Sequence, residues 1–224
     1  MDGIAGYLRK ATDMHLDRQI EELRGKSVVL YPGIDFSGFD SVARTSDYNA
    51  PVIVWNHRWE HDKNPETFFE TMMQLSADGI NFKLIILGQH FIHGPEIFAR
   101  SRKVLKKHII HFGYAAEKKE YIRLLHQADI VVSTSIHEFF GMAVLEAVRC
   151  GCRPVVPDRL SYCELFPRKF RYLEGDFYRS IASVTDNYQR MGKHDCLELA
   201  GPYAWQNMAR KYEKWLVSYF VKNI

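Results

Sequence analysis

The sequence has few cysteines, no long apolar run and only a small excess of positive charge. Four of the 224 residues are cysteine, too few and too unevenly spaced for a disulfide scaffold, so we interpret them as buried thiols of a reducing compartment. No apolar run approaches the roughly 18 residues of a transmembrane helix. The first residues also lack the basic flank and apolar stretch of a secretory signal. We therefore expect a cytoplasmic protein, also present in the nucleus, with no membrane partner.

What is present is the composition of a globular domain. Hydrophobic residues make up 46% of the chain and charged residues 25%, which provides a core and excludes a disordered or low-complexity chain. The net charge of +3 is compatible with an anionic ligand or RNA but is too small to demonstrate either.

Short β-branched runs alternate with helical patterns along most of the chain. The runs lie at 28–31, 52–55, 82–87, 109–112, 130–132 and 155–156, and most are bounded by Gly, Pro, Asn or Ser. A helical pattern follows Asn64-Pro65, where an N-cap residue precedes proline at the first helical position. This alternation predicts an α/β fold, a Rossmann-like parallel sheet with helices on both faces and flanking helices.

We divide the chain into three parts. Residues 1–26 are expected to be a helix or linker, 27–170 the Rossmann-like domain and 171–224 a C-terminal helical tail. In this tail Trp205, Met208, Tyr212, Trp215 and Tyr219 recur at helical spacing and predict an amphipathic helix with an aromatic face. That face packs either on its own domain or on a neighbouring one.

The segment after the 52–55 run contains two cations before a predicted helix. Ligands of open α/β sheets bind outside the carboxyl ends of the strands. Arg58 and Lys63 flank a turn into a helix N-terminus there, an arrangement that suits a diphosphate. The alternative is a solvated basic pair in a loop.

The same segment reads His57-x-x-Glu60-His61, a pattern found in some zinc peptidases. Such a site needs both histidines on one face of a helix. Because Asn64-Pro65 places the helix start after the pattern, a zinc site is the weaker interpretation.

Two glutamates bracket a glycine after the 130–132 run. Gly141 opens a predicted helix whose first N–H groups would face a ligand in the crevice. Glu138 lies just before this turn and Glu146 lies within the helix, where it could accept hydrogen bonds from ribose hydroxyls. Either glutamate alone could be a cap or a surface charge, but the pair around a strand-to-helix turn is more specific.

These residues together resemble a known family. Glu138-x7-Glu146 with Phe140-Gly141 inside it, and Arg58-x4-Lys63 upstream, are similar to the donor-binding, C-terminal half of retaining GT-B glycosyltransferases of the glycogen-synthase-like class. The resemblance implies that Arg58 and Lys63 bind the diphosphate of a nucleotide sugar, Glu138 the sugar and Glu146 the ribose. It also implies that the loop Gly88-Gln89-His90 approaches the nucleoside and that Glu164 lies near the donor.

The resemblance further implies a catalytic group of Glu138, Arg58 and Lys63. The full donor-binding set is Arg58, Lys63, Gly88, His137, Glu138, Phe140, Gly141, Met142, Glu146 and Glu164. The sequence contains no Asp-x-Asp, which agrees with the metal-independent chemistry of GT-B enzymes, so we expect no cofactor and no metal.

The strings from Trp55 to Pro65, from His137 to Gly141 and from Pro157 to Tyr162 resemble one subfamily, the mannosyltransferases of tRNA queuosine. This implies a hexosyltransferase that moves mannose from GDP-mannose, as the nucleotide sugar, to queuosine in the anticodon of aspartate tRNA. A GT-B enzyme has two Rossmann-like domains, so we expect the N-terminal acceptor domain to be missing here. The alternatives are a UDP-sugar donor and a non-catalytic form that only binds nucleotide sugar.

Overall fold

The computed structural model describes residue 6 and residues 17–42, 48–89, 95–188 and 190–222. Its centre is a parallel sheet of six strands in the order β3-β2-β1-β4-β5-β6. The strands are β1 (Val52–Asn56), β2 (Lys83–Leu87), β3 (Ile109–Gly113), β4 (Ile130–Val132), β5 (Arg153–Pro157) and β6 (Arg171–Tyr172). The predicted α/β fold is therefore confirmed.

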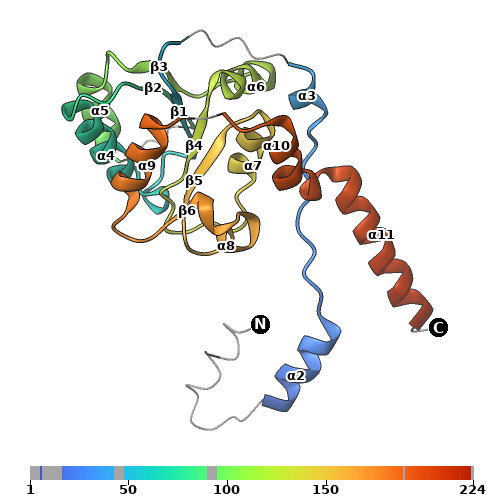
Figure 1. The fold of residues 1–224 in the computed structure, drawn as a ribbon. Coiled ribbons are helices and arrows are strands. Elements are labelled where there is room, and N and C mark those ends of the chain that lie inside the picture. The colour runs from blue at the N-terminus through green and yellow to red at the C-terminus, as the bar shows by residue number, and fades with distance from the viewer. Residues whose placement is uncertain (1–5, 7–16, 43–47, 90–94, 189, 223–224) are drawn as a thin grey trace.

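Helices cover both faces of the sheet (Figure 1). One face carries α4 (Pro65–Ala77), α5 (Ile97–Val104) and α9 (Phe177–Asp186); the other carries α3 (Ser37–Asp40), α6 (Lys118–Gln127), α7 (Met142–Arg149) and α10 (Lys193–Ala200). Alternate residues of β1 enter the two cores: Val52 and Val54 face α6 and α7, while Ile53 and Trp55 face α4 and α5. Because β1 is buried on both faces, its sequence is continuously apolar.

The remaining elements of the described chain are α2 (Asp17–Lys26), η1 (His61–Lys63), α8 (Tyr162–Leu165), η2 (Arg168–Phe170), η3 (Gly201–Tyr203) and α11 (Trp205–Lys222). Figure 1 shows α2 and the far end of α11 extending away from the sheet and its helices. No helix in the described ranges is long and apolar enough to cross a membrane.

The strand predicted at 28–31 is wrong. The segment is not hydrogen-bonded to the sheet, and Val28 and Val29 are exposed. Just beyond it, Ile34 pairs with the chain around Ala204: its N–H donates to the Tyr203 carbonyl, and its own carbonyl accepts from Trp205. An apolar β-branched run indicates extended backbone, but only a neighbouring strand makes it part of a sheet.

The last strand was not predicted. β6 consists of two residues that pair with β5, too short a segment to produce an alternating or apolar pattern. It lies immediately after residue 170, so the sheet extends past the expected end of the Rossmann-like domain. The three-part division of the chain stays a prediction.

The predicted C-terminal helix is present as α11, and its two halves differ. Met208 is fully buried and the Tyr212 hydroxyl donates to the Tyr31 carbonyl, so the first half is held by the body of the protein. Further along, Trp215, Tyr219 and Phe220 are exposed.

The chain order creates one switch point in the sheet. From β1 it runs outward through β2 to β3, and then returns to the other side of β1 with β4. The loops that leave the carboxyl ends of β1 and β4 therefore diverge to opposite sides and leave a crevice between them, the usual ligand position of an open α/β sheet.

Candidate functional site

The loops after β1 and β4 are joined at the switch point by main-chain hydrogen bonds. The carbonyl oxygen of Asp62 accepts from the N–H groups of Ile136 and His137 at 2.8 and 3.3 Å. The hydroxyl of Thr134 donates to the carbonyl of Lys63 at 2.8 Å. Together these bonds form the loop clamp, which brings the two predicted halves of the site together.

Lys63 lies inside the loop clamp. Its side chain is only 9% exposed, and its ammonium group donates to the His137 carbonyl at 2.7 Å. The same Nζ lies 3.0 Å from the Asp62 carboxylate and 3.5 Å from that of Glu138. Lys63 is therefore a buried counter-ion that holds both carboxylates, and the interpretation of a solvated loop cation does not apply to it.

Arg58 is placed differently. Its side chain is 60% exposed and forms an ion pair of 3.1 Å with Glu60. Arg58 also lines a cavity of about 210 Å³ at the carboxyl ends of β1, β2 and β3. Since its competing partner is itself a surface group, Arg58 is the cation of the predicted pair that can turn toward a ligand.

Glu138 closes the turn before α7. One carboxylate oxygen, Oε1, accepts from the N–H groups of Phe140 and Gly141 at 3.3 and 3.0 Å. The first helical hydrogen bond of α7 runs from Leu145 to the Gly141 carbonyl, so the N–H groups of residues 142–144 have no acceptor within the helix. The sequence predicted an anion at this helix start; the carboxylate of Glu138 already occupies the N–H group of Gly141, and the next turn stays open beside the half-exposed Met142.

Gly88 allows the loops after β1 and β2 to touch. Its φ is +154°, and a Cβ there would lie 1.9 Å from the carbonyl oxygen of His57. The neighbouring Gln89 carbonyl accepts from the Trp59 N–H at 3.1 Å. Gly88 lines the 210 Å³ cavity with Leu87, Tyr114 and Ala115, while His90, the end of the predicted nucleoside loop, lies outside the described residues.

Glu146 is held by a chain of hydrogen bonds from β1. The Tyr121 hydroxyl donates to Glu146 Oε2 at 2.7 Å and accepts from the Asn56 side-chain amide at 3.2 Å. Burial raises the pKa of the Glu146 carboxyl, while the hydrogen bond from Tyr121 acts in the opposite direction. Tyr121 lines the 210 Å³ cavity, so Glu146 lies one hydrogen bond behind its wall.

Glu164 lies at a second hollow, of about 520 Å³, which is also lined by Glu138, Phe140 and Tyr31. Its carboxylate accepts a hydrogen bond from the Tyr31 hydroxyl, which raises the pKa of Tyr31 to about 12. The Tyr31 ring stacks on Phe140 at a centroid distance of 5.6 Å. Glu164 therefore lines the same hollow as Glu138, and its hydrogen-bond partner belongs to the segment that precedes the sheet.

The geometry does not support the zinc interpretation of His57-x-x-Glu60-His61. His57 is buried at the end of β1, whereas the His61 side chain is mostly exposed on η1, so the two imidazoles do not share a helical face. In the described part of the chain, the group of residues that could hold a metal is His194, Asp195 and Glu198, exposed on α10 and distant in sequence from this pattern.

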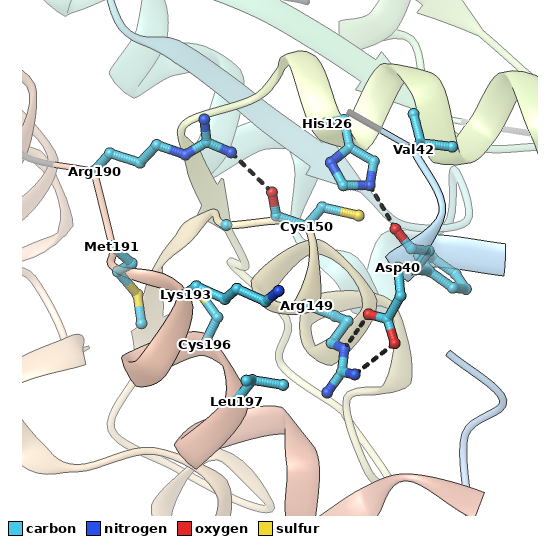
Figure 2. A pocket seen from close by; sticks show the side chains of 12 residues that line it. Asp40, Val42, His126, Arg149, Cys150, Arg190, Met191, Lys193, Cys196 and Leu197 are labelled. Carbon is cyan, nitrogen blue, oxygen red and sulfur yellow. Dashed lines mark hydrogen bonds and ion pairs between the residues drawn. The ribbon is translucent and has the colours of Figure 1, made fainter. Parts of the chain in front are cut away.

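Another cavity, of about 560 Å³, lies at the opposite, amino-terminal ends of the strands, where α7 ends and β5 begins (Figure 2). Arg149 forms a two-pronged ion pair with Asp40 at 2.6 and 2.7 Å. Arg190 donates to the Cys150 carbonyl at 3.1 Å and so caps the C-terminus of α7. These cations hold helices together, and the cavity is separate from the switch-point crevice.

Comparison with known proteins agrees with this geometry. Residues 39–173 match the family model described as "Glycosyl transferases group 1". The tRNA-queuosine alpha-mannosyltransferase of Drosophila melanogaster is 35% identical over 180 residues, 77% of this chain and 48% of that protein. A probable sucrose-phosphate synthase of Thermosipho melanesiensis is 24% identical over 203 residues, 85% of this chain and 47% of that protein.

Among solved structures, sucrose-phosphate synthase from Thermosynechococcus elongatus superposes with a TM-score of 0.69 at 15% identity, covering 87% of this chain and 53% of that one. This likeness shows that the fold is that of a GT-B glycosyltransferase domain. The chain spans about half the length of the curated relatives it matches.

Sequence reasoning gave no role in the site to Asn56, Asp62, Tyr31 or Tyr121. Asn56 follows four apolar residues of β1 directly, and a polar residue at a strand end is a usable signal. For Tyr121 and Tyr31 no such signal exists, because their partners lie 25 and 133 residues away in the sequence.

The loop clamp leads to a prediction for Lys63. In Lys63→Met, two carboxylates lose their buried counter-ion, and we expect the free energy of unfolding to fall by roughly 3 kcal/mol or more. The matched substitution Arg58→Met removes an exposed charge and should change it by no more than about 0.5 kcal/mol. Urea denaturation of both variants measures the difference, and equal effects would contradict the assignment of Lys63 as the buried ion.

His57 gives a pH dependence. Burial lowers the pKa of its imidazole from 6.5 to about 4, so between these values the unfolded chain binds a proton that the folded chain does not. Stability contributed by the neutral ring is complete above pH 6.5 and is lost as the pH falls toward 4. Between pH 7.5 and 4.5 the wild-type chain should lose about 2–3 kcal/mol more than His57→Gln. If urea denaturation shows the same loss of unfolding free energy for both proteins between these pH values, the prediction is refuted.

Proposed function

The chain belongs to the group 1 glycosyl transferases, and on that premise we propose that it is the donor-binding part of an enzyme that transfers mannose from GDP-mannose to queuosine in tRNA. The observation that carries the proposal is the loop clamp at the switch point. It brings the Arg58–Lys63 segment and the Glu138–Glu146 segment to one crevice at the carboxyl ends of β1 and β4.

We place the donor along this crevice in four parts. The base occupies the 210 Å³ cavity beside Gly88 and Tyr114, where the glycine lets the ligand approach the main chain. The ribose lies toward Glu146. The diphosphate lies between Arg58 and the open first turn of α7, because a guanidinium and helical N–H groups both favour phosphate oxygens. The sugar reaches Glu138, and Glu164 with Phe140 borders it on the far side.

In the proposed reaction the bond between the sugar and the diphosphate breaks, and charge develops on the leaving phosphate. Arg58 and the positive end of α7 stabilise that charge. Lys63 contributes positive potential and keeps the Glu138 carboxylate in place through its buried ion pair. His137 and Met142 flank this turn, and the His137 carbonyl is held by Lys63. The acceptor hydroxyl then attacks from the face that the diphosphate leaves and gives its proton to the departing phosphate oxygen. This retains the configuration of the sugar without a metal ion.

The acceptor part of the proposal comes from the comparison with a relative. The similarity to the Drosophila enzyme extends over 77% of this chain and is the support for queuosine tRNA. Because the chain spans about half of that protein, we propose that the acceptor is bound mainly by a second Rossmann-like domain.

Calorimetric titration of the chain with GDP-mannose, GDP, UDP-glucose and UDP-N-acetylglucosamine tests the donor. We expect binding of the two guanosine ligands in preference to the uridine ligands. Preference for a uridine ligand would replace GDP-mannose with a UDP-sugar donor. Binding of GDP-mannose without transfer to queuosine tRNA, even with an acceptor domain supplied, would favour a non-catalytic form. If the chain binds none of the four ligands, the proposed donor site is refuted.

The placement of the diphosphate predicts the effect of Arg58→Ala. A charge-assisted contact to phosphate contributes about 1.5–3 kcal/mol, so the affinity for GDP should fall at least tenfold while stability is retained. Arg179→Ala, which removes a similarly exposed arginine on α9, is the control and should leave the affinity unchanged. Equal GDP affinity in Arg58→Ala and the wild type would contradict the placement.

A further inference from the structure

A directed chain of hydrogen bonds links the end of β1 to the carboxylate of Glu146. The Asn56 side-chain nitrogen donates to the Ala143 carbonyl at 2.8 Å and to the Tyr121 hydroxyl at 3.2 Å. The Tyr121 hydroxyl lies 2.7 Å from Glu146 Oε2 and donates to it. Three elements therefore meet here: β1, α6 and α7.

The direction of this chain is fixed by chemistry. A main-chain carbonyl can only accept, so the amide nitrogen of Asn56, and not its oxygen, must face Ala143. The Tyr121 hydroxyl then receives a hydrogen bond from Asn56, and its single proton is directed to Glu146. Burial and the neighbouring carboxylate raise the pKa of Tyr121 well above its ordinary value, so the hydroxyl keeps this proton at neutral pH.

This chain of hydrogen bonds uses one carboxylate oxygen of Glu146, Oε2, and leaves the other, Oε1, without a partner in the chain. Within the described ranges, Oε1 of Glu146 accepts no hydrogen bond from the protein. It is also absent from the fully buried polar atoms without a partner, so this oxygen is at least partly accessible. Burial raises the pKa of Glu146, and this rise is opposed by the hydrogen bond from Tyr121 and by the charged group that faces the carboxylate from α6, Lys118. With Tyr121 it favours the ionised form, which is the form that accepts hydrogen bonds from hydroxyl groups.

We infer that Tyr121, aligned by Asn56, is a positioning residue that turns the second oxygen of Glu146 toward a sugar hydroxyl and so makes the site select ribonucleotides over deoxynucleotides. This inference rests on the proposed donor site, in which Glu146 already faces the ribose, and adds to it the residue that holds the Glu146 carboxylate in place. Tyr121 lines the 210 Å³ cavity, so the carboxylate that it holds lies one hydrogen bond behind the wall of the proposed nucleoside position.

The substitution that tests this role is Tyr121→Phe. The ring packs edge-on against Phe39 at a centroid distance of 6.5 Å, and phenylalanine keeps that contact while it removes only the hydroxyl. Tyr188→Phe is the matched control. Its hydroxyl also donates to a carboxylate, Asp129 Oδ1 at 2.9 Å, but Asp129 directly precedes β4, at the amino ends of the strands and away from the crevice at their carboxyl ends.

The measurement is calorimetric titration with GDP, 2′-deoxy-GDP and 3′-deoxy-GDP, with UDP and its deoxy forms in parallel. The wild type and Tyr188→Phe should bind the ribonucleotide about tenfold or more tightly than at least one deoxy form, the effect of one hydrogen bond to a charged group. In Tyr121→Phe this ratio should fall to about threefold or less, because ribonucleotide binding weakens and deoxynucleotide binding does not. A purely structural role would weaken all ligands alike.

A second variant shows whether Tyr121 acts through Glu146. Glu146→Ala should abolish the same preference, and Tyr121→Phe added to it should cause no further change in the ratio. A full ribonucleotide preference in Tyr121→Phe would overturn the inference and leave the donor site intact. Equal binding of ribo- and deoxynucleotides by the wild type would also overturn it. A wild-type chain that binds no nucleotide would refute the proposed function and this inference together.

Discussion

The candidate site depends on one buried ammonium group. Lys63 links the loop after β1 to the loop after β4, because its Nζ contacts the Asp62 and Glu138 carboxylates and the His137 carbonyl. Without this cation two carboxylates would lie close together in a poorly solvated position, at a large electrostatic cost. With it, Glu138 is held so that its other oxygen closes the turn before α7. Every further placement of donor groups in the crevice follows from the position of this turn.

The two basic residues of the Arg58-x4-Lys63 pattern therefore have different physical roles. Lys63 is buried and its interactions are satisfied by the protein, whereas Arg58 is mostly exposed and its partner Glu60 is a surface group. A ligand can compete for an exposed ion pair at little cost, because such pairs contribute about 1 kcal/mol or less. The two glutamates also differ: Glu138 Oε1 accepts hydrogen bonds from the N–H groups of Phe140 and Gly141, whereas Glu146 Oε2 accepts one from the Tyr121 hydroxyl.

The segment before the sheet takes part in the site through its aromatic residue. Tyr31 stacks on Phe140, donates to Glu164 and offers its carbonyl to Tyr212 of α11. The first half of α11 is thus connected to the turn that carries Glu138. Because Ile34 also pairs with Ala204, the segment before the sheet and the chain that enters α11 meet beside the proposed sugar position.

The sequence by itself determined the α/β fold, five of the six strands and the two segments that carry Arg58, Lys63, Glu138 and Glu146. These follow from local signals: apolar runs, helix starts at Pro65 and Gly141, and polar residues after strands. It gave a strand at 28–31 where the chain only runs extended, and no sign of β6, because pairing depends on a neighbour that local pattern does not contain. Tertiary structure alone decided that Lys63 is buried and Arg58 exposed, that Glu164 pairs with Tyr31, and that Tyr121 holds Glu146. The reason is that burial and hydrogen-bond partners depend on residues up to 133 positions apart in the sequence, whereas a sequence pattern contains information only about residues close to one another in the chain.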